Sequence, residues 1–359
     1  MISRFARAFG RFGTIALGAL VASGIVATDA ALADSSRPAK ELFGGVGLPS
    51  SGPSRSVGFY AKGCLAGAVA IPTDGPTWQA MRLSRNRRWG NPQMIALVER
   101  LSKDVAQKDG WPGLLLGDIS QPRGGPMLTG HASHQIGLDA DIWLTPMPSR
   151  TLSAAERENM PFTSMLVKDK FLTIDPNRWT PAHARLIMRA ASYPEVERVF
   201  VNPAIKKKLC DTWHGDRSLL GKVRPVYGHD SHFHIRMHCP PGMSGCKPQA
   251  PVAAGDGCDK SLAWWFTDEP WKKPKKDPDA KPVAPRHTML SDLPQACTAV
   301  LNAPGPASEM QATYGRGAGA TAAAAAPPAQ DPASRLEAQS YAPVPDRVPI
   351  PLVRPLDNE

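Results

Sequence analysis

The sequence lacks the short motifs of several familiar enzyme and redox classes. None of its six cysteines lies in a CxxC pair, which argues against a thiolate metal site and a thioredoxin-like redox centre. No HExxH motif occurs, so the helical arrangement of the familiar zinc proteases is excluded. Ser133 has a histidine beside it but no G-x-S-x-G elbow around it, which disfavours a serine hydrolase.

A long apolar run is also missing. The apolar stretch at residues 14–27 contains Gly and Ser and is shorter than the roughly 20 residues of a membrane span, so we expect no stable membrane anchor. It follows a basic start, and "ALA" at residues 31–33 offers small side chains for cleavage after Ala33. Residues 1–33 therefore indicate a signal peptide, and we expect the mature chain in a bacterial periplasm.

Acidic residues are fewer than basic ones, and the formal net charge is +10. The basic residues are scattered and form no Arg/Lys stripe interleaved with aromatic residues, so we expect no nucleic-acid partner. An exported basic chain suits an anionic polymer instead, such as a carboxylate-rich cell wall, or a membrane surface.

Aromatic residues and cysteines are concentrated between residues 55 and 300, where we find no internal repeat. This distribution predicts one domain over residues 34–300. Residues 301–359 are rich in Ala, Pro and Gly with almost no aromatic residues, which predicts a disordered tail because such a segment cannot bury a core. An even number of cysteines in an exported chain predicts disulfides, with the pairing left open.

Periodicity and end signals predict the main elements of this domain. An Asn-Pro and a Thr-Pro pair open two helices, and short apolar runs indicate buried strands. The predicted segments are helices at residues 92–109, 181–191 and 203–210 and strands at residues 113–119 and 198–202.

Histidine is scarce and unevenly distributed. Of the nine histidines, four lie in the stretch "HDSHFHIRMHC" at residues 229–239. With a period of two, His232, His234 and Arg236 fall on one face of a strand and apolar residues fall on the other. Two imidazoles on alternate residues are roughly 7 Å apart at the backbone, close enough to share a metal ion. Taken alone, the pattern also fits a solvated basic strand face.

A second cluster makes coincidence hard to maintain. The stretch "GHASHQIGLDADIW" at residues 130–143 contains His131, His134, Asp139 and Asp141. Two histidines and one aspartate form a ligand set that leaves an open position on zinc for water, which is typical of a catalytic site. Asp139 fits two roles equally well, either orienting a ligand histidine or satisfying nearby backbone.

Long motifs in a shared order resemble one group of peptidases. The spacings His-x6-Asp (His134 to Asp141) and His-x-His (His232 to His234) are similar to those of zinc peptidases related to lysostaphin-type and D-alanyl-D-alanine peptidases. Within that group, about residues 55–270 resemble the penicillin-insensitive murein endopeptidases of Gram-negative bacteria. The stretches that carry this resemblance are "GCLAGA", "GDISQPRGGP", "GHASHQIGLDADIW", "VFVNPAIKKKLC", "RPVYGHDSHFHIRMHCP" and "GDGC".

The resemblance implies roles for individual residues. Zinc ligation is implied for His134, Asp141 and His234, and catalytic roles are implied for His232, His229 and His131. Among the catalytic histidines, His232 is implied as the base or as a stabiliser of the transition state. The remaining histidines, His183, His214, His238 and His287, receive no functional role.

The resemblance also implies a fold and a set of disulfides. The fold is α+β, a small antiparallel sheet that carries the zinc site, with helices packed around it and disulfides that staple it. The implied disulfides are Cys64–Cys297, Cys210–Cys258 and Cys239–Cys246.

The implied activity is hydrolysis of the D-alanyl–meso-diaminopimelyl cross-bridges of peptidoglycan by a Zn²⁺ enzyme. Penicillin would not inhibit it, because no serine is acylated. A D,D- or L,D-carboxypeptidase or dipeptidase acting on uncross-linked muropeptides would use the same ligands. A non-catalytic zinc-binding module, as in sonic hedgehog, would bind the metal without turnover. The sequence leaves open the oligomeric state and which of the three histidines is the general base.

Overall fold

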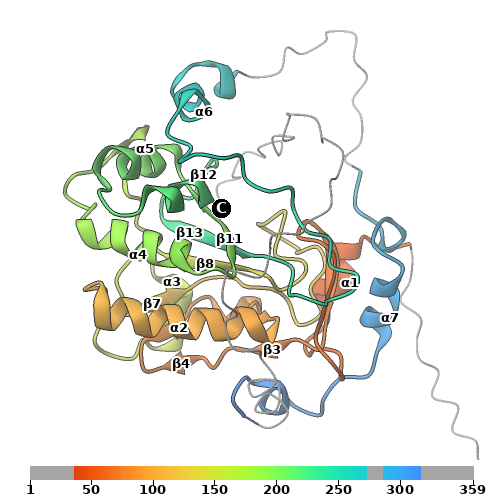
Figure 1. The fold of residues 1–359 in the computed structure, drawn as a ribbon. Helices are drawn as coiled ribbons and strands as arrows, with labels where there is room; N and C mark the ends of the chain where they lie inside the picture. Colours follow the sequence, from red (N-terminus) through yellow and green to blue (C-terminus); the bar gives the residue numbers. More distant parts are fainter. Residues whose placement is uncertain (1–35, 273–285, 317–359) are drawn as a thin grey trace, which may run out of the picture. The chain divides into compact units, whose positions relative to one another are not determined.

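The computed structural model of the chain describes residues 36–272 and 286–316 (Figure 1). The predicted signal peptide, residues 1–33, lies outside this range, as do residues 317–359 of the predicted tail. Within the described residues, none of the helices is both long enough and apolar enough to cross a membrane.

A seven-stranded mixed sheet organises the described part of the chain, in the order β12-β11-β13-β8-β7-β5-β4. Its strands are β4 (Asp74–Gly75), β5 (Trp78–Ala80), β7 (Leu114–Leu116), β8 (Asp139–Trp143), β11 (Val196–Val201), β12 (Val223–Pro225) and β13 (His232–Met237). Three two-stranded sheets accompany it, formed by β1 (Arg55–Phe59) with β2 (Lys62–Ala66), β3 (Val69–Ala70) with β6 (Trp89–Gly90), and β9 (Leu166–Val167) with β10 (Lys170–Ile174).

The expected small antiparallel sheet is therefore wrong in size and in type, although the α+β class holds. The central strands β11, β13, β8 and β7 pair antiparallel, but β5 pairs parallel to β7 and β11 pairs parallel to β12. Both parallel pairs are joined by a chain segment that contains a helix, as is usual for a parallel connection. The period-two patterns predict individual strands and give no information on these crossovers.

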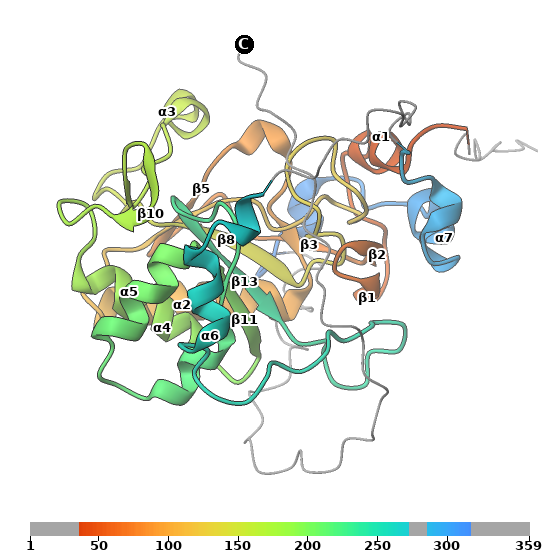
Figure 2. The ribbon, with the colours of Figure 1, turned by 90° about the horizontal axis from the view of Figure 1, so that it is seen from above.

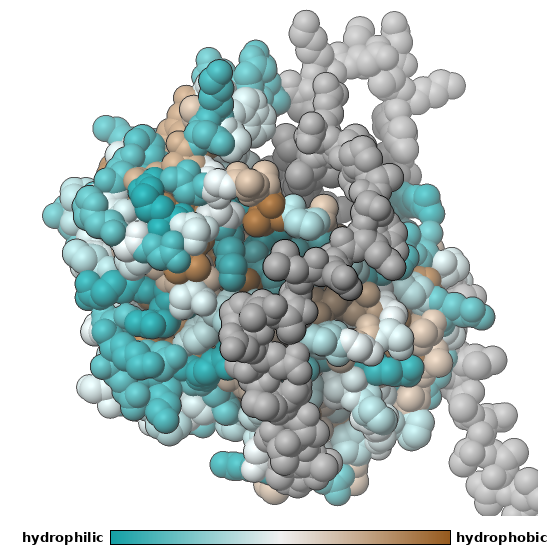
Figure 3. Space-filling model, viewed as in Figure 1, coloured by the Kyte–Doolittle hydropathy of each residue, from teal (hydrophilic) through white to brown (hydrophobic). Residues whose placement is uncertain are grey.

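The helices are α1 (Ala39–Gly44), α2 (Pro92–Lys108), α3 (Ala154–Asn159), α4 (Pro181–Ser192), α5 (Pro203–Thr212), α6 (Lys260–Ala263) and α7 (Ala296–Asn302). The signals predicted for the start of α2 are present in the structure. The Asn91 side chain accepts a hydrogen bond from the backbone N–H of Gln93 at 3.0 Å, and Pro92 occupies the first turn of α2. On the face seen in Figure 3, hydrophilic residues predominate over α4 and α5, because the apolar sides of these helices face the core.

The two faces of the central strands differ in character. On one face, the apolar residues of β8 and β13 join the main core together with the apolar sides of α2 and α4. These strand residues are Ala140, Ile142, Phe233 and Ile235, all fully buried. The opposite face carries the aspartates of β8 and the histidines of β13, so the alternation read from the sequence separates core from site.

Three disulfides tie peripheral segments to this framework, in the pairing that the resemblance implies. They are Cys64–Cys297, Cys210–Cys258 and Cys239–Cys246. The first joins α7 to β2, and both views show α1 and α7 beside β1 and β2 (Figures 1 and 2). A separate apolar cluster fills the space between these four elements.

The folded region continues past the expected boundary at residue 300. A short 3-10 helix spans Glu309–Ala312, and the Tyr314 side chain reaches the main core. The backbone N–H of Tyr314 donates to the carbonyl of Ala70 at 2.8 Å. The segment is also held by a bridge between Ala70 and Thr313, by the burial of Ala312 and by an ion pair between Arg88 and Glu309, and composition carries no signal for these contacts.

Candidate metal centre

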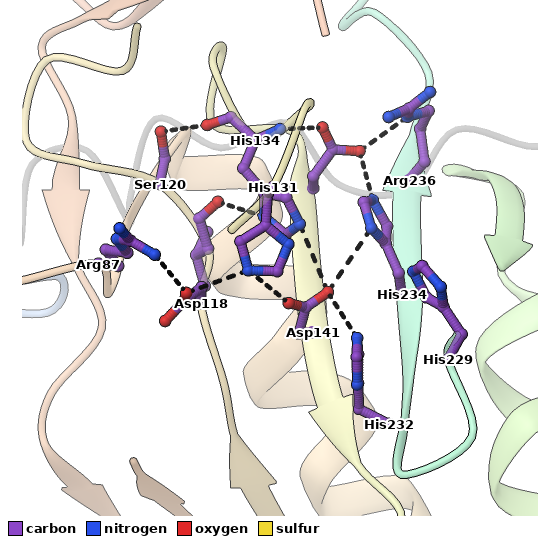
Figure 4. A network of polar contacts seen from close by, with 12 residues as sticks. Arg87, Asp118, Ser120, His131, His134, Asp141, His229, His232, His234 and Arg236 are labelled. Carbon is purple, nitrogen blue, oxygen red and sulfur yellow. Dashed lines mark hydrogen bonds and ion pairs between the residues drawn. The ribbon is translucent and has the colours of Figure 1, made fainter. Parts of the chain in front are cut away.

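The pairing of β8 with β13 brings the two histidine-containing segments together. In their antiparallel register, His234 lies opposite Asp141 and Arg236 lies opposite Asp139. Figure 4 shows the side chains of Asp141 and His234 converging with those of His131 and His134, which come from the loop before β8. The site is thus built from segments about a hundred residues apart in the sequence.

The loop before β8 holds His134 in a constrained conformation. His134 has a backbone φ of +67°, a value that non-glycine residues adopt only where the surroundings enforce it. Its backbone N–H donates to Asp139 Oδ2 at 3.0 Å, and its carbonyl accepts from Ser120 Oγ at 2.6 Å. Its ring Nδ1 donates to the carbonyl of Ile119 at 2.7 Å, which leaves Nε2 as the atom with a free lone pair.

Asp141 lies at the centre of the cluster. Its Oδ1 is 3.4 Å from His134 Nε2, 3.6 Å from His234 Nδ1 and 3.9 Å from His232 Nε2. Both Asp141 Oδ1 and His134 Nε2 are buried, and neither has a hydrogen-bond partner. Buried polar atoms without a partner are costly, so two of them facing each other fit a site that takes up a cation.

Asp139 contacts both kinds of partner that the sequence left open, a histidine of the site and the nearby backbone. Its Oδ1 accepts from His234 Nε2 at 2.8 Å and from Arg236 Nε at 2.7 Å, while Oδ2 accepts from the backbone of His134. The contact with Nε2 fixes the His234 tautomer and turns Nδ1 toward Asp141. A carboxylate behind a ligand histidine is a frequent arrangement in metal sites.

Sequence reasoning missed Asp118. This buried carboxylate follows β7, and its Oδ2 contacts His131 Nε2 at 3.1 Å and Arg87 Nη1 at 2.9 Å. His131 Nε2 also lies 3.3 Å from Asp141 Oδ2. An aspartate directly after the apolar run "GLLLG" is the signal that could have identified it, since a buried charge needs partners.

The group of residues best placed to hold a metal differs from the expected ligand set in one member. Ligand atoms of His131, His134 and Asp141 all lie within 4.8 Å of one another. His131 was expected to act in catalysis, and His234 was expected to be the third ligand. His234 does approach Asp141 Oδ1, so both histidines border the same site.

The other expected catalytic histidines line the outer side of the cluster. The His232 and His229 rings are 4.9 Å apart, and the His229 ring is 6.0 Å from that of His234. His229 has a φ of +52°, and its Nδ1 donates to the carbonyl of Tyr227 at 3.0 Å. His238 lies elsewhere, with its Nδ1 3.9 Å from Glu197 Oε2.

The charges around the site favour a cation beside Asp141. Burial alone would lower the pKa of His134, but the Asp141 carboxylate, helped by Asp139 and the carbonyl of Ile119, outweighs it and raises this pKa to about 9. Burial lowers the pKa of His234 to about 3, and burial together with His232 lowers that of His229 to about 4. A proton on His134 thus occupies the place beside Asp141 that a metal ion would take.

Known proteins match this chain over a range that includes every residue of the site. A family model described as penicillin-insensitive murein endopeptidase matches residues 56–302. The chain belongs to this family. A relative in Haemophilus influenzae with the same description is 46% identical over 259 residues, covering 72% of this chain and 86% of the relative. Another, in Klebsiella pneumoniae subsp. pneumoniae, is 38% identical over 278 residues, covering 77% and 97%.

The murein endopeptidase family match extends over nearly the full described domain. It includes both histidine clusters, Asp118, and all six cysteines. A relative in Pectobacterium atrosepticum is 37% identical over 277 residues, covering 77% of this chain and 94% of the relative. The clustered residues therefore lie within the part of the chain that matches the family.

Proposed function

We propose that the chain is a zinc metallopeptidase of the periplasm that hydrolyses the D-alanyl–meso-diaminopimelyl cross-bridges of peptidoglycan. The observation that carries this proposal is the pair of buried, unpartnered atoms His134 Nε2 and Asp141 Oδ1 facing each other. Membership of the murein endopeptidase family supports the substrate class. A basic chain is compatible with the free carboxylates of that substrate.

We assign the zinc ligands as His134 Nε2, Asp141 Oδ1 and His234 Nδ1. Two neutral imidazole nitrogens and one carboxylate oxygen are a donor set that zinc accepts in catalytic sites. Both ligand histidines are oriented from behind, because the carbonyl of Ile119 binds the other nitrogen of His134 and Asp139 binds the other nitrogen of His234. His131 is tied to Asp118 and is more exposed than the two ligand histidines, so we assign it to substrate contact.

When bound, zinc supplies Lewis-acid activation of the scissile carbonyl and of water. The chain's own residues handle the protons. His232 lies on the same strand face as His234, is partly exposed, and can take the proton of the attacking water and return it to the leaving amine. His229 packs beside it with Nδ1 bonded to Tyr227, so its Nε2 is a second acceptor. No serine is acylated in this scheme, so penicillin has no nucleophile to trap.

The test is incubation of the purified chain with cross-linked murein dimers, followed by chromatography, with parallel runs containing penicillin, a chelator or the His134→Ala variant. We expect dimers to become monomers in the presence of penicillin, but not with the chelator or the variant. Trimmed monomers with intact dimers would indicate the carboxypeptidase instead. Bound zinc with no change in either substrate would indicate a binding module. Recovery of the chain in the periplasmic fraction tests the location.

A further inference from the structure

A strained turn borders the metal centre. The short 3-10 helix Leu83–Arg85 lies between Arg82 and Asn86, both of which have left-handed backbone conformations with φ of +53° and +51°. Two such non-glycine residues flanking one turn cost free energy and persist only where contacts hold them in place. Strain of this kind often marks a functional site.

The contacts that hold the turn are present at both ends. The Arg82 guanidinium donates to the carbonyls of Arg157 at 3.0 Å and Met160 at 2.6 Å. At the other end, Asn86 Oδ1 accepts from Trp89 Nε1 at 2.7 Å. The turn therefore presents Arg85 from a fixed backbone.

Arg85 reaches into the edge of the site and remains partly exposed. Its Nη1 donates to Asp118 Oδ2 at 3.2 Å, the oxygen that also contacts His131 and Arg87. The Arg85 side chain is 39% exposed, whereas that of Arg87 is 7% exposed. Among the described residues, Asp118 is the only hydrogen-bond or ion-pair partner of the Arg85 side chain. Most N–H donors of its guanidinium are therefore available to another acceptor.

The local charge also favours an anionic ligand. Arg82, Arg85 and Arg87 lie around this corner with two carboxylates, Asp118 and Glu158. The Glu158 carboxylate is engaged by the backbone N–H and the hydroxyl of Ser84. Among these five groups one positive charge remains in excess, and Arg85 is the arginine whose side chain is exposed. The nearby Asp141 is assigned to the metal.

The distance to the metal centre is short. Three successive contacts, of 3.2, 3.1 and 3.3 Å, connect Arg85 through Asp118 and His131 to Asp141. A substrate group bonded close to the scissile amide would therefore come within reach of the guanidinium. In a D-alanyl–meso-diaminopimelyl bridge, the carbon attached to the scissile nitrogen also carries a free carboxylate.

We propose that Arg85 binds this diaminopimelyl carboxylate and thereby selects the amine side of the cross-bridge. This inference rests on the proposed function and adds a specificity residue to it. The planar guanidinium matches a carboxylate through two parallel hydrogen bonds, a geometry that lysine does not reproduce. The strained, doubly anchored turn keeps the guanidinium in position before the substrate arrives.

The test compares two murein dimers, one with this carboxylate free and one with it amidated, on the full chain and its variants. We expect Arg85→Gln to raise KM for the free-carboxylate dimer about 10- to 100-fold, with a small effect on kcat. On the amidated dimer, wild type and Arg85→Gln should have equal KM, and Arg85→Lys should be intermediate on the free form. Arg100→Gln is the matched control, because Arg100 is also 39% exposed but pairs with Glu195 away from the site.

Two results would overturn the role of Arg85. An equal loss of kcat on both dimers would mean that Arg85 acts through Asp118 and His131, and unchanged kinetics would remove it from recognition. Turnover of neither dimer by wild type would refute the proposed function instead. In that case, calorimetric titration with the two dimers still tests the role of Arg85. Arg85→Gln must then weaken binding of the free-carboxylate dimer and leave binding of the amidated dimer unchanged.

Discussion

Two buried histidines near opposite ends of β8 show how differently the same side chain is used. His134 precedes the strand and is 0% exposed, and His183 contacts the residue after it and is 4% exposed. Nδ1 of His183 accepts from the backbone N–H of Thr180 at 3.0 Å, and Nε2 donates to the carbonyl of Leu144 at 3.1 Å. Both nitrogens of His183 are satisfied, whereas Nε2 of His134 has no partner.

The difference separates a structural histidine from the one that we propose as a zinc ligand. His183 closes the capping box at the start of α4, and its ring packs 4.9 Å from Trp111 and 5.3 Å from Trp179. His134 is equally buried, but its unpartnered nitrogen faces a carboxylate. Burial therefore does not identify the functional histidine, and the hydrogen-bond partners do.

The largest expected effect comes from removing the unpartnered nitrogen. His134→Ala should lower cleavage of murein dimers by about a thousandfold or more and abolish zinc binding, since a ligand is lost. Turnover assays and metal analysis of the purified variant measure both effects. The metal-free variant should unfold at a urea concentration close to that of the chelated wild type. A variant that keeps its zinc would contradict the assignment of this nitrogen.

A second pair of variants distinguishes the two histidines that compete for the third ligand position. His234→Ala should weaken zinc affinity more than a hundredfold, because Nδ1 is oriented toward Asp141 by Asp139. His131→Ala should leave zinc affinity within about threefold while reducing turnover, because we assign His131 to substrate contact. Competition with a chromogenic chelator gives both affinities. The reverse order would make His131 the ligand.

Asp139→Asn should have a smaller effect on the metal and a larger one on the fold. Loss of the charged acceptor behind His234 should weaken zinc affinity by about 10- to 100-fold. The buried Arg236 guanidinium would lose a 2.7 Å ionic partner, which should lower the free energy of unfolding by about 3 kcal/mol. Chelator competition measures the zinc affinity, and urea unfolding measures the free energy of unfolding. Unchanged zinc affinity would show that Asp139 serves only the backbone and Arg236.

Much of this site could be predicted because strand alternation is a local signal. The period-two pattern predicted that His232 and His234 share one face of a strand, as β13 shows, and the same period puts Asp139 and Asp141 together on one face of β8. What it could not give is the register between them, which depends on the whole sheet.

Asp118 and the parallel strand pairs were missed for the same physical reason. Asp118 becomes part of the site only because a tertiary contact at 3.1 Å brings it to His131, thirteen residues further along the chain. Likewise, β5 and β7 pair across the long α2 helix. The Tyr314 contact that extends the folded region is also tertiary. Neither periodicity nor composition contains such information.

The smallest expected effect comes from replacing His183, the structural histidine of the comparison. His183→Gln keeps an acceptor for the capping box but loses the bond to Leu144 and the aromatic contacts. At pH 7.5 it should lower the free energy of unfolding by about 1–2 kcal/mol. Turnover should stay within about twofold, because no described contact joins His183 to the metal centre.

This loss should shrink in acid. Burial lowers the pKa of His183 below its ordinary value of 6.5, so the folded chain binds this proton more weakly than the unfolded chain. The stability contributed by neutral His183 is therefore present above about pH 6.5 and disappears as the pH falls. Glutamine does not titrate, so the difference between wild type and variant in urea unfolding should be smaller at pH 5 than at pH 7.5. A difference that stays constant would mean that His183 takes up its proton equally well in the folded chain, and the contrast with His134 would then rest on hydrogen bonding alone.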